Sequence, residues 1–129
     1  MNGCTRKITV DSLKNCYVLP NGIEPIEQTA ATLELKPGIH VIRISKGTFS
    51  YFPDGAEARS SVLLWIAGGK FTHNASKYPI SAGWACLNGA DDTCTINVAA
   101  TTKVHALFLD TYRNDNDGQI ELAVLSDAL

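Results

Sequence analysis

Clusters of turn-forming residues divide the chain into short segments, and the spacing of these turns constrains the fold more than any other feature. Pro, Gly, Asn and Asp gather at positions 20–22, 37–38, 53–55, 68–69, 88–89 and 115–118. These residues favour tight turns and interrupt helices. Short segments between such turns are typical of strands in an all-β sandwich or barrel. The only helical turn that we expect lies within 23–31, where Pro25 limits its length.

Between the turns, apolar and polar residues alternate with the period of a strand. The pattern predicts strands at 7–10, 16–19, 32–36, 39–45, 93–98, 103–112 and 119–126. Segment 61–67 is a continuous apolar run after Ser61, which predicts a strand in the middle of the sandwich that ends at Gly68 and Gly69. The residues expected to point inward are Leu33, Leu35, Ile42, Ile44, Cys94, Ile96 and Val98. The sequence therefore predicts one domain over residues 1–129, an all-β, jelly-roll-like sandwich.

Composition and charge limit the classes of partner. The chain has 129 residues, 45% apolar and 19% charged, which suits one domain with its own core. A formal net charge of −2 gives no electrostatic reason to expect nucleic acid or an anionic membrane as partner. No apolar run approaches the roughly 18 residues of a membrane helix. The N-terminal residues lack the apolar middle of a signal peptide, so we expect a cytoplasmic or non-classically exported protein, or one whose leader has been removed.

The segment 110–117 is dense in oxygen-bearing side chains. They are Asp110, Thr111, Asn114, Asp115, Asn116 and Asp117. Calcium takes six to eight such oxygen ligands, and crowded carboxylates repel one another unless a positive charge lies among them. Asn, Asp and Gly are equally the usual residues of a solvated hairpin turn, so both readings stay open. An EF-hand is excluded, because Arg113 would occupy the first loop position, where a carboxylate is required.

Other distinctive residues carry less information. We expect Trp65 in the core, and Trp84 there too, with stacking on a sugar as its alternative role. His40 and His105 fall on predicted strands and His73 in a predicted loop, without a pattern that indicates a catalytic triad or a zinc site.

The four cysteines lack the tight CxxC pair of a zinc site. Cys86 and Cys94 flank a hairpin-like turn, which allows a disulfide across it. The alternative is that all four are small, buried apolar residues.

Separated segments of the chain resemble one known family. Segment 37–51, PGIHVIRISKGTFSY, is similar to the part of the soluble bacterial calcium-dependent galactose-binding lectins in which a strand runs into a turn that ends in Tyr. Segment 61–69, SVLLWIAGG, is similar to the family's next apolar strand, and 110–118, DTYRNDNDG, resembles its calcium loop. The resemblance covers roughly residues 37–125 and implies a galactose-binding-like jelly roll.

The resemblance also implies a set of site residues. Position by position, the calcium ligands are Tyr51 through its backbone oxygen, Asp110, Thr111, Asn114 and Asp115. The residues expected to contact the bound ligand are Asp54, Asp110 and Asn114. Two departures weaken the case for galactose itself: Asp110 and Thr111 are adjacent here, and residues 52–60 lack the His and Gln side chains that hold the sugar in the lectins.

We therefore expect a non-catalytic binding domain that recognises carbohydrate with the help of Ca²⁺. The alternative is a structural or protein-interaction sandwich with a stabilising calcium or no metal. An enzyme is not expected, because glycan hydrolysis needs two carboxylates at a suitable separation and no spacing supports such a pair for Asp54 and Asp110. A homo-oligomer is left open.

Overall fold

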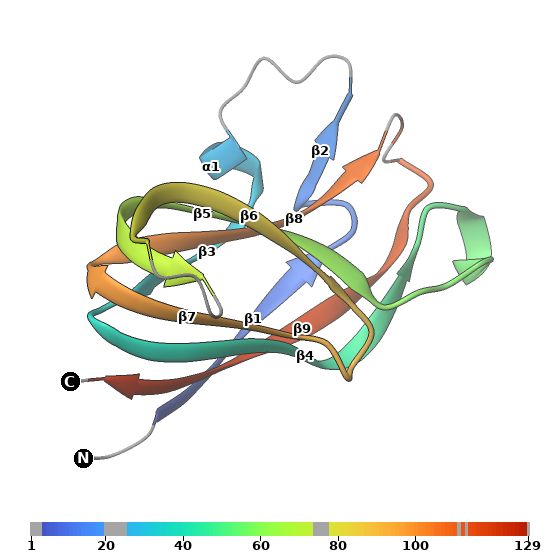
Figure 1. The fold of residues 1–129 in the computed structure, drawn as a ribbon. Coiled ribbons are helices and arrows are strands. Elements are labelled where there is room, and N and C mark those ends of the chain that lie inside the picture. The colour runs from blue at the N-terminus through green and yellow to red at the C-terminus, as the bar shows by residue number, and fades with distance from the viewer. Residues whose placement is uncertain (1–3, 20–25, 74–77, 111, 113, 129) are drawn as a thin grey trace.

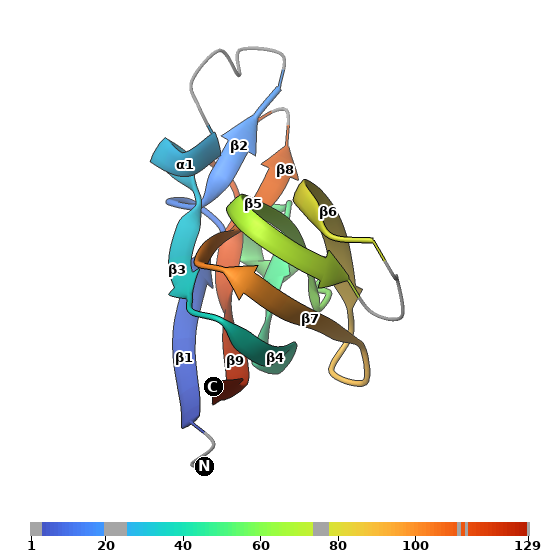
Figure 2. The ribbon, with the colours of Figure 1, turned by 60° about the vertical axis from the view of Figure 1, so that its left-hand side comes forward.

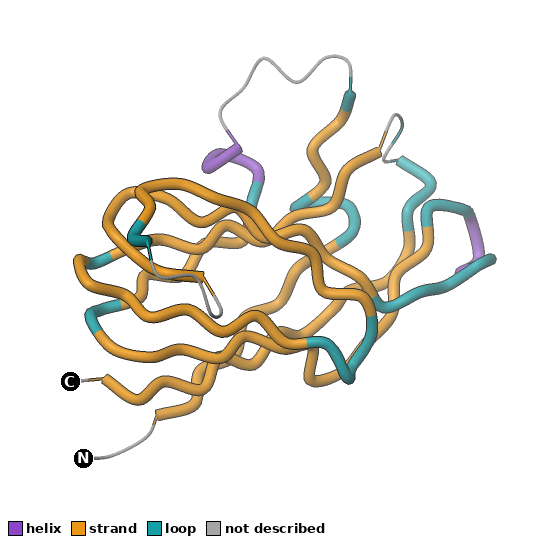
Figure 3. The backbone as a smooth tube through the Cα atoms, viewed as in Figure 1, coloured by secondary structure: helices purple, strands orange, loops and turns teal. Residues whose placement is uncertain are grey.

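The computed structural model describes residues 4–19, 26–73, 78–110, 112 and 114–128, and most of them lie in strands (Figures 1 and 3). The elements are β1 (Cys4–Asp11), β2 (Cys16–Val18), α1 (Ile26–Thr29), β3 (Ala31–Leu35), β4 (Gly38–Ser50), a 3₁₀ turn (Pro53–Gly55), β5 (Ser61–His73), β6 (Ile80–Asn88), β7 (Thr93–Ala100), β8 (Thr102–Asp110) and β9 (Asp117–Ala128). No helix in these residues is long and apolar enough to cross a membrane.

The strands form two faces around one core. One face has the order β1-β9-β4-β7 and the other β3-β8-β5-β6, with all these pairs antiparallel. The faces are continuous, because the end of β5 from Lys70 to His73 pairs with β7 (Figure 2). At the opposite edges, Arg6 Nη1 of β1 donates a hydrogen bond of 3.0 Å to Glu34 O of β3. This arrangement confirms the predicted all-β, jelly-roll-like sandwich, built here from one curled sheet of nine strands.

Strand alternation creates the core. The predicted inward positions on β4 and β7 are all buried, and Leu35 is buried while Leu33 is partly buried. The core also contains Val10, Leu64, Ile66, Val104, Phe108, Ile120, Leu122 and Val124. Burial of each such apolar side chain contributes about 1.5–3 kcal/mol, so the two faces are held together chiefly by this shared interior.

Most of the predicted strands are present, and several are longer than predicted. β1, β4 and β9 extend beyond segments 7–10, 39–45 and 119–126, because their neighbours pair with them over nearly their whole length. The segment 103–112 forms a strand only to Asp110. β6 was not predicted, and α1 forms the helical turn expected within 23–31, of which residues 23–25 lie outside the described part.

β5 corrects three predictions. Its side chains alternate between buried and partly exposed, because none of the described elements forms a second layer over its outer face. Gly68 and Gly69 do not end the strand: the register shifts between Ala67 and Phe71, and β5 continues to His73, which was predicted in a loop. A Cβ on Gly69 would lie 2.2 Å from Thr101 O, so glycine permits the backbone of β5 to approach residue 101 closely at this bend.

The tryptophan and cysteine predictions also change. Trp84 is 65% exposed and Trp65 is only partly buried, on the side of β5 opposite to the buried Leu64 and Ile66, so neither tryptophan is in the core. The two are paired across β5 and β6 on the outer face of the sheet. Cys86 faces outward and is exposed whereas Cys94 faces inward and is buried, and both thiols are free. The disulfide is therefore absent, and burial holds for Cys16 and Cys94 but not for Cys4 and Cys86.

Candidate functional site

The C-terminal ends of β4 and β8 and the N-terminal end of β9 lie at the same edge of the molecule. The pairing of β4 with β9 runs as far as Ser50 and Asp117, so Tyr51, just after β4, lies near Asn116, just before β9. The buried Ser50 hydroxyl donates hydrogen bonds to the carbonyls of Phe52 (3.2 Å) and Ala56, which closes the turn that follows Tyr51. The segments that the resemblance singled out therefore meet in space.

Tyr51 lies against the core and close to an acidic group. Its ring packs edge-on against Phe49, with 4.9 Å between ring centroids, and the Arg59 guanidinium lies 5.9 Å from its ring centroid. Burial raises the pKa of Tyr51, the negative charge of Asp110 raises it further, and Arg59 opposes the shift. Tyr51 and Asp110 are thus close enough to interact electrostatically.

Asp110 ends β8 at a position fixed by the N-terminal part of the chain. β2 pairs in parallel with the end of β8, with Val18 opposite Asp110. The Leu19 N–H donates a hydrogen bond of 2.7 Å to Asp110 O. The main chain at Asp110 is therefore held on one side, while its partly buried carboxylate lies near Tyr51.

Asn116 is a buried side chain with a fixed orientation. Its Nδ2 donates to Ser12 O at 2.9 Å and to Cys16 Sγ at 3.5 Å. Its Oδ1 is buried and accepts no hydrogen bond from the described residues, and the same is true of Asp115 Oδ1. Two acceptor oxygens from neighbouring residues are therefore buried without a donor in the described part of the chain.

The remaining predicted site residues lie around this cluster or outside it. Asn114 is exposed, and Thr111 lies outside the described residues. Asp54 is exposed in the 3₁₀ turn, with a φ of 60°. That turn packs on the start of β9, where a Cβ on Gly55 would lie 3.5 Å from Asp117 Oδ2.

Sequence reasoning missed the residues that hold the site in place. The Ser12 N–H and Oγ both donate to Gly118 O, at 3.2 and 2.7 Å, and the Phe108 N–H donates to Asn15 O at 2.8 Å. Residues 12–16 thus hold both ends of segment 110–117, although they lie outside the region of resemblance. The available signal was the Asp-Ser turn at 11–12, where Asp11 Oδ2 accepts hydrogen bonds of 2.9 Å from the N–H groups of Leu13 and Lys14.

The donor set suits a hard cation. Carboxylate, amide and main-chain oxygens are the ligands that calcium prefers. No group of three or more His, Cys, Asp or Glu side chains in the described residues could hold a metal, so an ion here would depend on the Asn116 amide and on main-chain oxygens as well as on carboxylates. Comparisons of the chain with protein-family models, with curated proteins and with solved structures find no match.

Proposed function

We propose that the chain is a non-catalytic binding module that holds Ca²⁺ at this edge of the sandwich and recognises a carbohydrate there. The observation that carries the proposal is the pair of buried acceptors, Asp115 Oδ1 and Asn116 Oδ1, which have no donor among the described residues. A buried polar group without a partner costs about 1–3 kcal/mol. A hard cation is the partner that satisfies several such oxygens at once.

The chain offers a consistent set of ligands. The carboxylates of Asp110 and Asp115, the amide oxygen of Asn116 and the backbone oxygen of Tyr51 would hold the ion, and Thr111 belongs to the same segment. Asn116 replaces the exposed Asn114 in the ligand set that the resemblance implies, because only Asn116 is buried and oriented. When bound, Ca²⁺ supplies coordination positions for two neighbouring sugar hydroxyls.

Polar side chains around the ion would complete the recognition of a sugar. Asp110 would accept hydrogen bonds from hydroxyls at the ion. Asn114 and Asp54 are exposed, in the same segment and in the neighbouring turn, and would contact the rest of the ring. Segment 52–60 lacks the His and Gln side chains that hold the sugar in the lectins that this chain resembles, so the sugar need not be galactose.

Calorimetry tests the proposal in two steps. Titration of CaCl₂ into chelator-treated protein should give a saturable heat, which Asn116→Ala reduces at least tenfold in affinity. Asn97→Ala, an exposed asparagine on β7, is the matched control and should bind Ca²⁺ as the unchanged protein does. A panel of monosaccharides should then give heat with Ca²⁺ but not with EGTA.

Each result has a distinct meaning. Calcium binding without heat from any sugar would favour the alternative, a structural sandwich with a stabilising ion. If neither Ca²⁺ nor sugar gives heat, the proposed function is wrong.

A further inference from the structure

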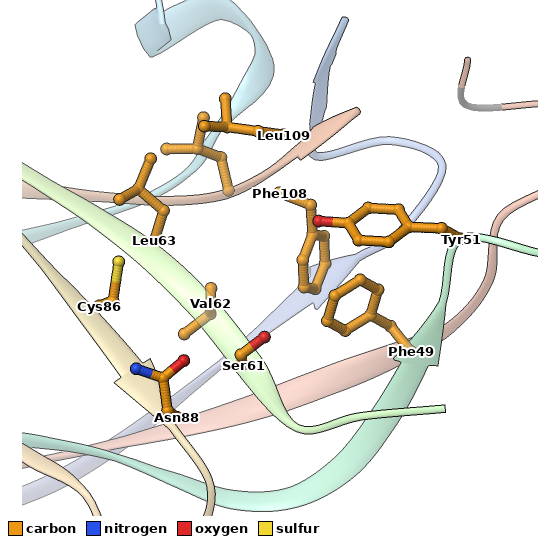
Figure 4. Close-up of a pocket in the computed structure, with 10 residues that line it drawn as sticks. Phe49, Tyr51, Ser61, Val62, Leu63, Cys86, Asn88, Phe108 and Leu109 are labelled. Atoms are coloured by element: carbon orange, nitrogen blue, oxygen red, sulfur yellow. The ribbon is translucent and has the colours of Figure 1, made fainter. Parts of the chain in front are cut away.

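A hollow opens at a fork in the sheet, next to the candidate site. The pairing of β5 with β8 ends at Leu63 and Leu107. Beyond this point β8 pairs with β2, starting at Phe108, whereas β5 stays with β6 as far as Ser61 and Asn88. The two strands diverge and leave a hollow of about 150 Å³ (Figure 4).

The walls of the fork hollow are mainly apolar. Phe49, Tyr51 and Phe108 form an aromatic wall, with the ring centroids of Phe49 and Phe108 4.2 Å apart. Leu63, Cys86 and Leu109 line the hollow from β5, β6 and β8 (Figure 4). Polar groups are few, with Ser61 and Asn88 together at one end.

The size and lining of the hollow define its occupant. A closed apolar cavity of about 150 Å³ accepts a benzene ring, so a hollow of this volume has room for one such ring. Aromatic walls also favour a flat ring, which gains contact from stacked or edge-on packing. The occupant expected from these features is one compact apolar group.

The hollow lies beside the candidate site. Tyr51 lines the hollow and also interacts with Asp110, and Leu109, at the rim, directly precedes Asp110. We propose that the fork hollow takes an apolar substituent the size of one aromatic ring, carried by the carbohydrate that the neighbouring site recognises. This inference rests on the proposed function for the sugar part, and it narrows the ligand class to glycosides with a compact aryl group.

Cys86 provides a built-in probe of the hollow. N-phenylmaleimide and N-methylmaleimide add to a thiolate in the same way: the sulfur forms a bond to one alkene carbon and the other takes a proton. Cys4 is a second exposed thiol in the same molecule and serves as the internal control. We expect the ratio of phenyl to methyl reaction rates to be at least tenfold higher at Cys86 than at Cys4, with saturation at high phenyl reagent concentration. Equal ratios at the two cysteines would overturn the hollow as an aryl site.

Filling the hollow gives an independent check. Leu109→Trp places an indole at the rim, where Leu109 is 40% exposed, and should abolish the phenyl preference of Cys86. Leu125→Trp, at a 54% exposed leucine on β9, is the matched control and should retain it. A preference that survives in Leu109→Trp would count against the inference.

Phenyl and methyl glycosides of galactose, glucose, mannose and fucose then test the link to the sugar. With Ca²⁺, at least one phenyl glycoside should bind at least tenfold tighter than its methyl counterpart, and Leu109→Trp should remove the gain. Equal binding of the two forms overturns the inference and leaves the proposed function intact. Failure of every glycoside and of Ca²⁺ itself overturns both.

Discussion

At the scale of single residues, Asn116 connects structure to the proposed function. Its amide nitrogen is held by Ser12 O and Cys16 Sγ, and this orientation leaves the amide oxygen for the candidate site. The exposed neighbour Asn114 lacks this burial, although the two residues look alike in the sequence. Which asparagine matters is decided by contacts with residues about one hundred positions away, which no local pattern encodes.

We expect Asn116→Ala to lower the free energy of unfolding even without calcium. The change leaves the buried Ser12 carbonyl without this donor, and such a loss costs about 1–3 kcal/mol. Urea denaturation in EDTA measures the effect. Asn97→Ala should stay within about 0.5 kcal/mol of the unchanged protein, as surface substitutions usually do. Equal midpoints for the two variants would show that the Asn116 amide does not support the fold.

His105 gives stability a dependence on pH. Burial lowers its pKa from 6.5, with Glu27 opposing the shift and Lys103 adding to it, and its Nδ1 lies 2.8 Å from Thr32 Oγ1. Because the folded state takes up the proton less readily than the unfolded chain, this contribution is complete above pH 6.5 and is lost as the pH falls through the folded-state pKa. His105→Gln should therefore lose less stability than the unchanged protein between pH 7.5 and 5.5, measured by urea denaturation. A larger loss in the variant would contradict the assignment.

At the scale of elements, the β4–β9 pair positions the site, and a glycine permits its close approach. Gly118 has a φ of +93°, and a Cβ at this position would lie 2.4 Å from Thr48 O on β4. Gly89 has a similar φ of +99°, but its Cβ would meet nothing within 4 Å. The two glycines thus share a backbone conformation and differ in their surroundings.

Replacing each glycine by alanine separates the two effects. Gly89→Ala should cost roughly 1–2 kcal/mol, the penalty of left-handed backbone for an L-residue. Gly118→Ala should cost at least about 2 kcal/mol more, because strands β4 and β9 must separate to admit the methyl group. Thermal unfolding followed by circular dichroism measures the difference. Equal costs would mean that the strands yield freely at Thr48.

Much of the strand arrangement could be predicted from the sequence. Alternation identified most of the strands, since one side of each faces a common core. It could not identify β6, because Gly83 and the outward-facing, apolar Trp84 and Cys86 break the alternation of apolar and polar residues. The sequence alone also does not distinguish a buried tryptophan from an exposed one such as Trp84. The resemblance singled out Tyr51 and Asp110, which the structure brings together, but not the residues at 12–16 that support them.

At the scale of the whole molecule, the sheet is continuous from one face to the other. β5 contributes to both faces, and β9 pairs with both β1 and β4. The candidate site lies at the edge where β4, β8 and β9 end, so its contacts belong to the same hydrogen-bonded network as the core. Stabilisation of the site should therefore raise the free energy of unfolding of the whole domain.

Calcium should raise the melting temperature as a single cooperative shift. At a free concentration one hundred times the dissociation constant, binding adds about 2.7 kcal/mol, a rise of more than about 5 °C for a domain of this size. Far-UV circular dichroism and the fluorescence of Trp65 and Trp84, which lie on the outer face of β5 and β6, should shift together. A shift in one signal alone would indicate that the site is uncoupled from the sandwich. Magnesium at the same concentration is the control and should have a smaller effect, since it rarely occupies all-protein oxygen sites.

The pairing of β1 with β9 joins segments more than one hundred residues apart, from Cys4 with Ser126 to Asp11 with Gln119. During translation, β1 leaves the ribosome long before its partner has been synthesised. Likewise, Ser12 can form its hydrogen bonds with Gly118 and Asn116 only after that part of the chain has been synthesised. A nascent chain stalled before β9 would therefore leave β1 and β4 without the strand that pairs with both, and it would lack the proposed ion site. If the proposal is right, affinity for the cation appears only after β9 has been synthesised.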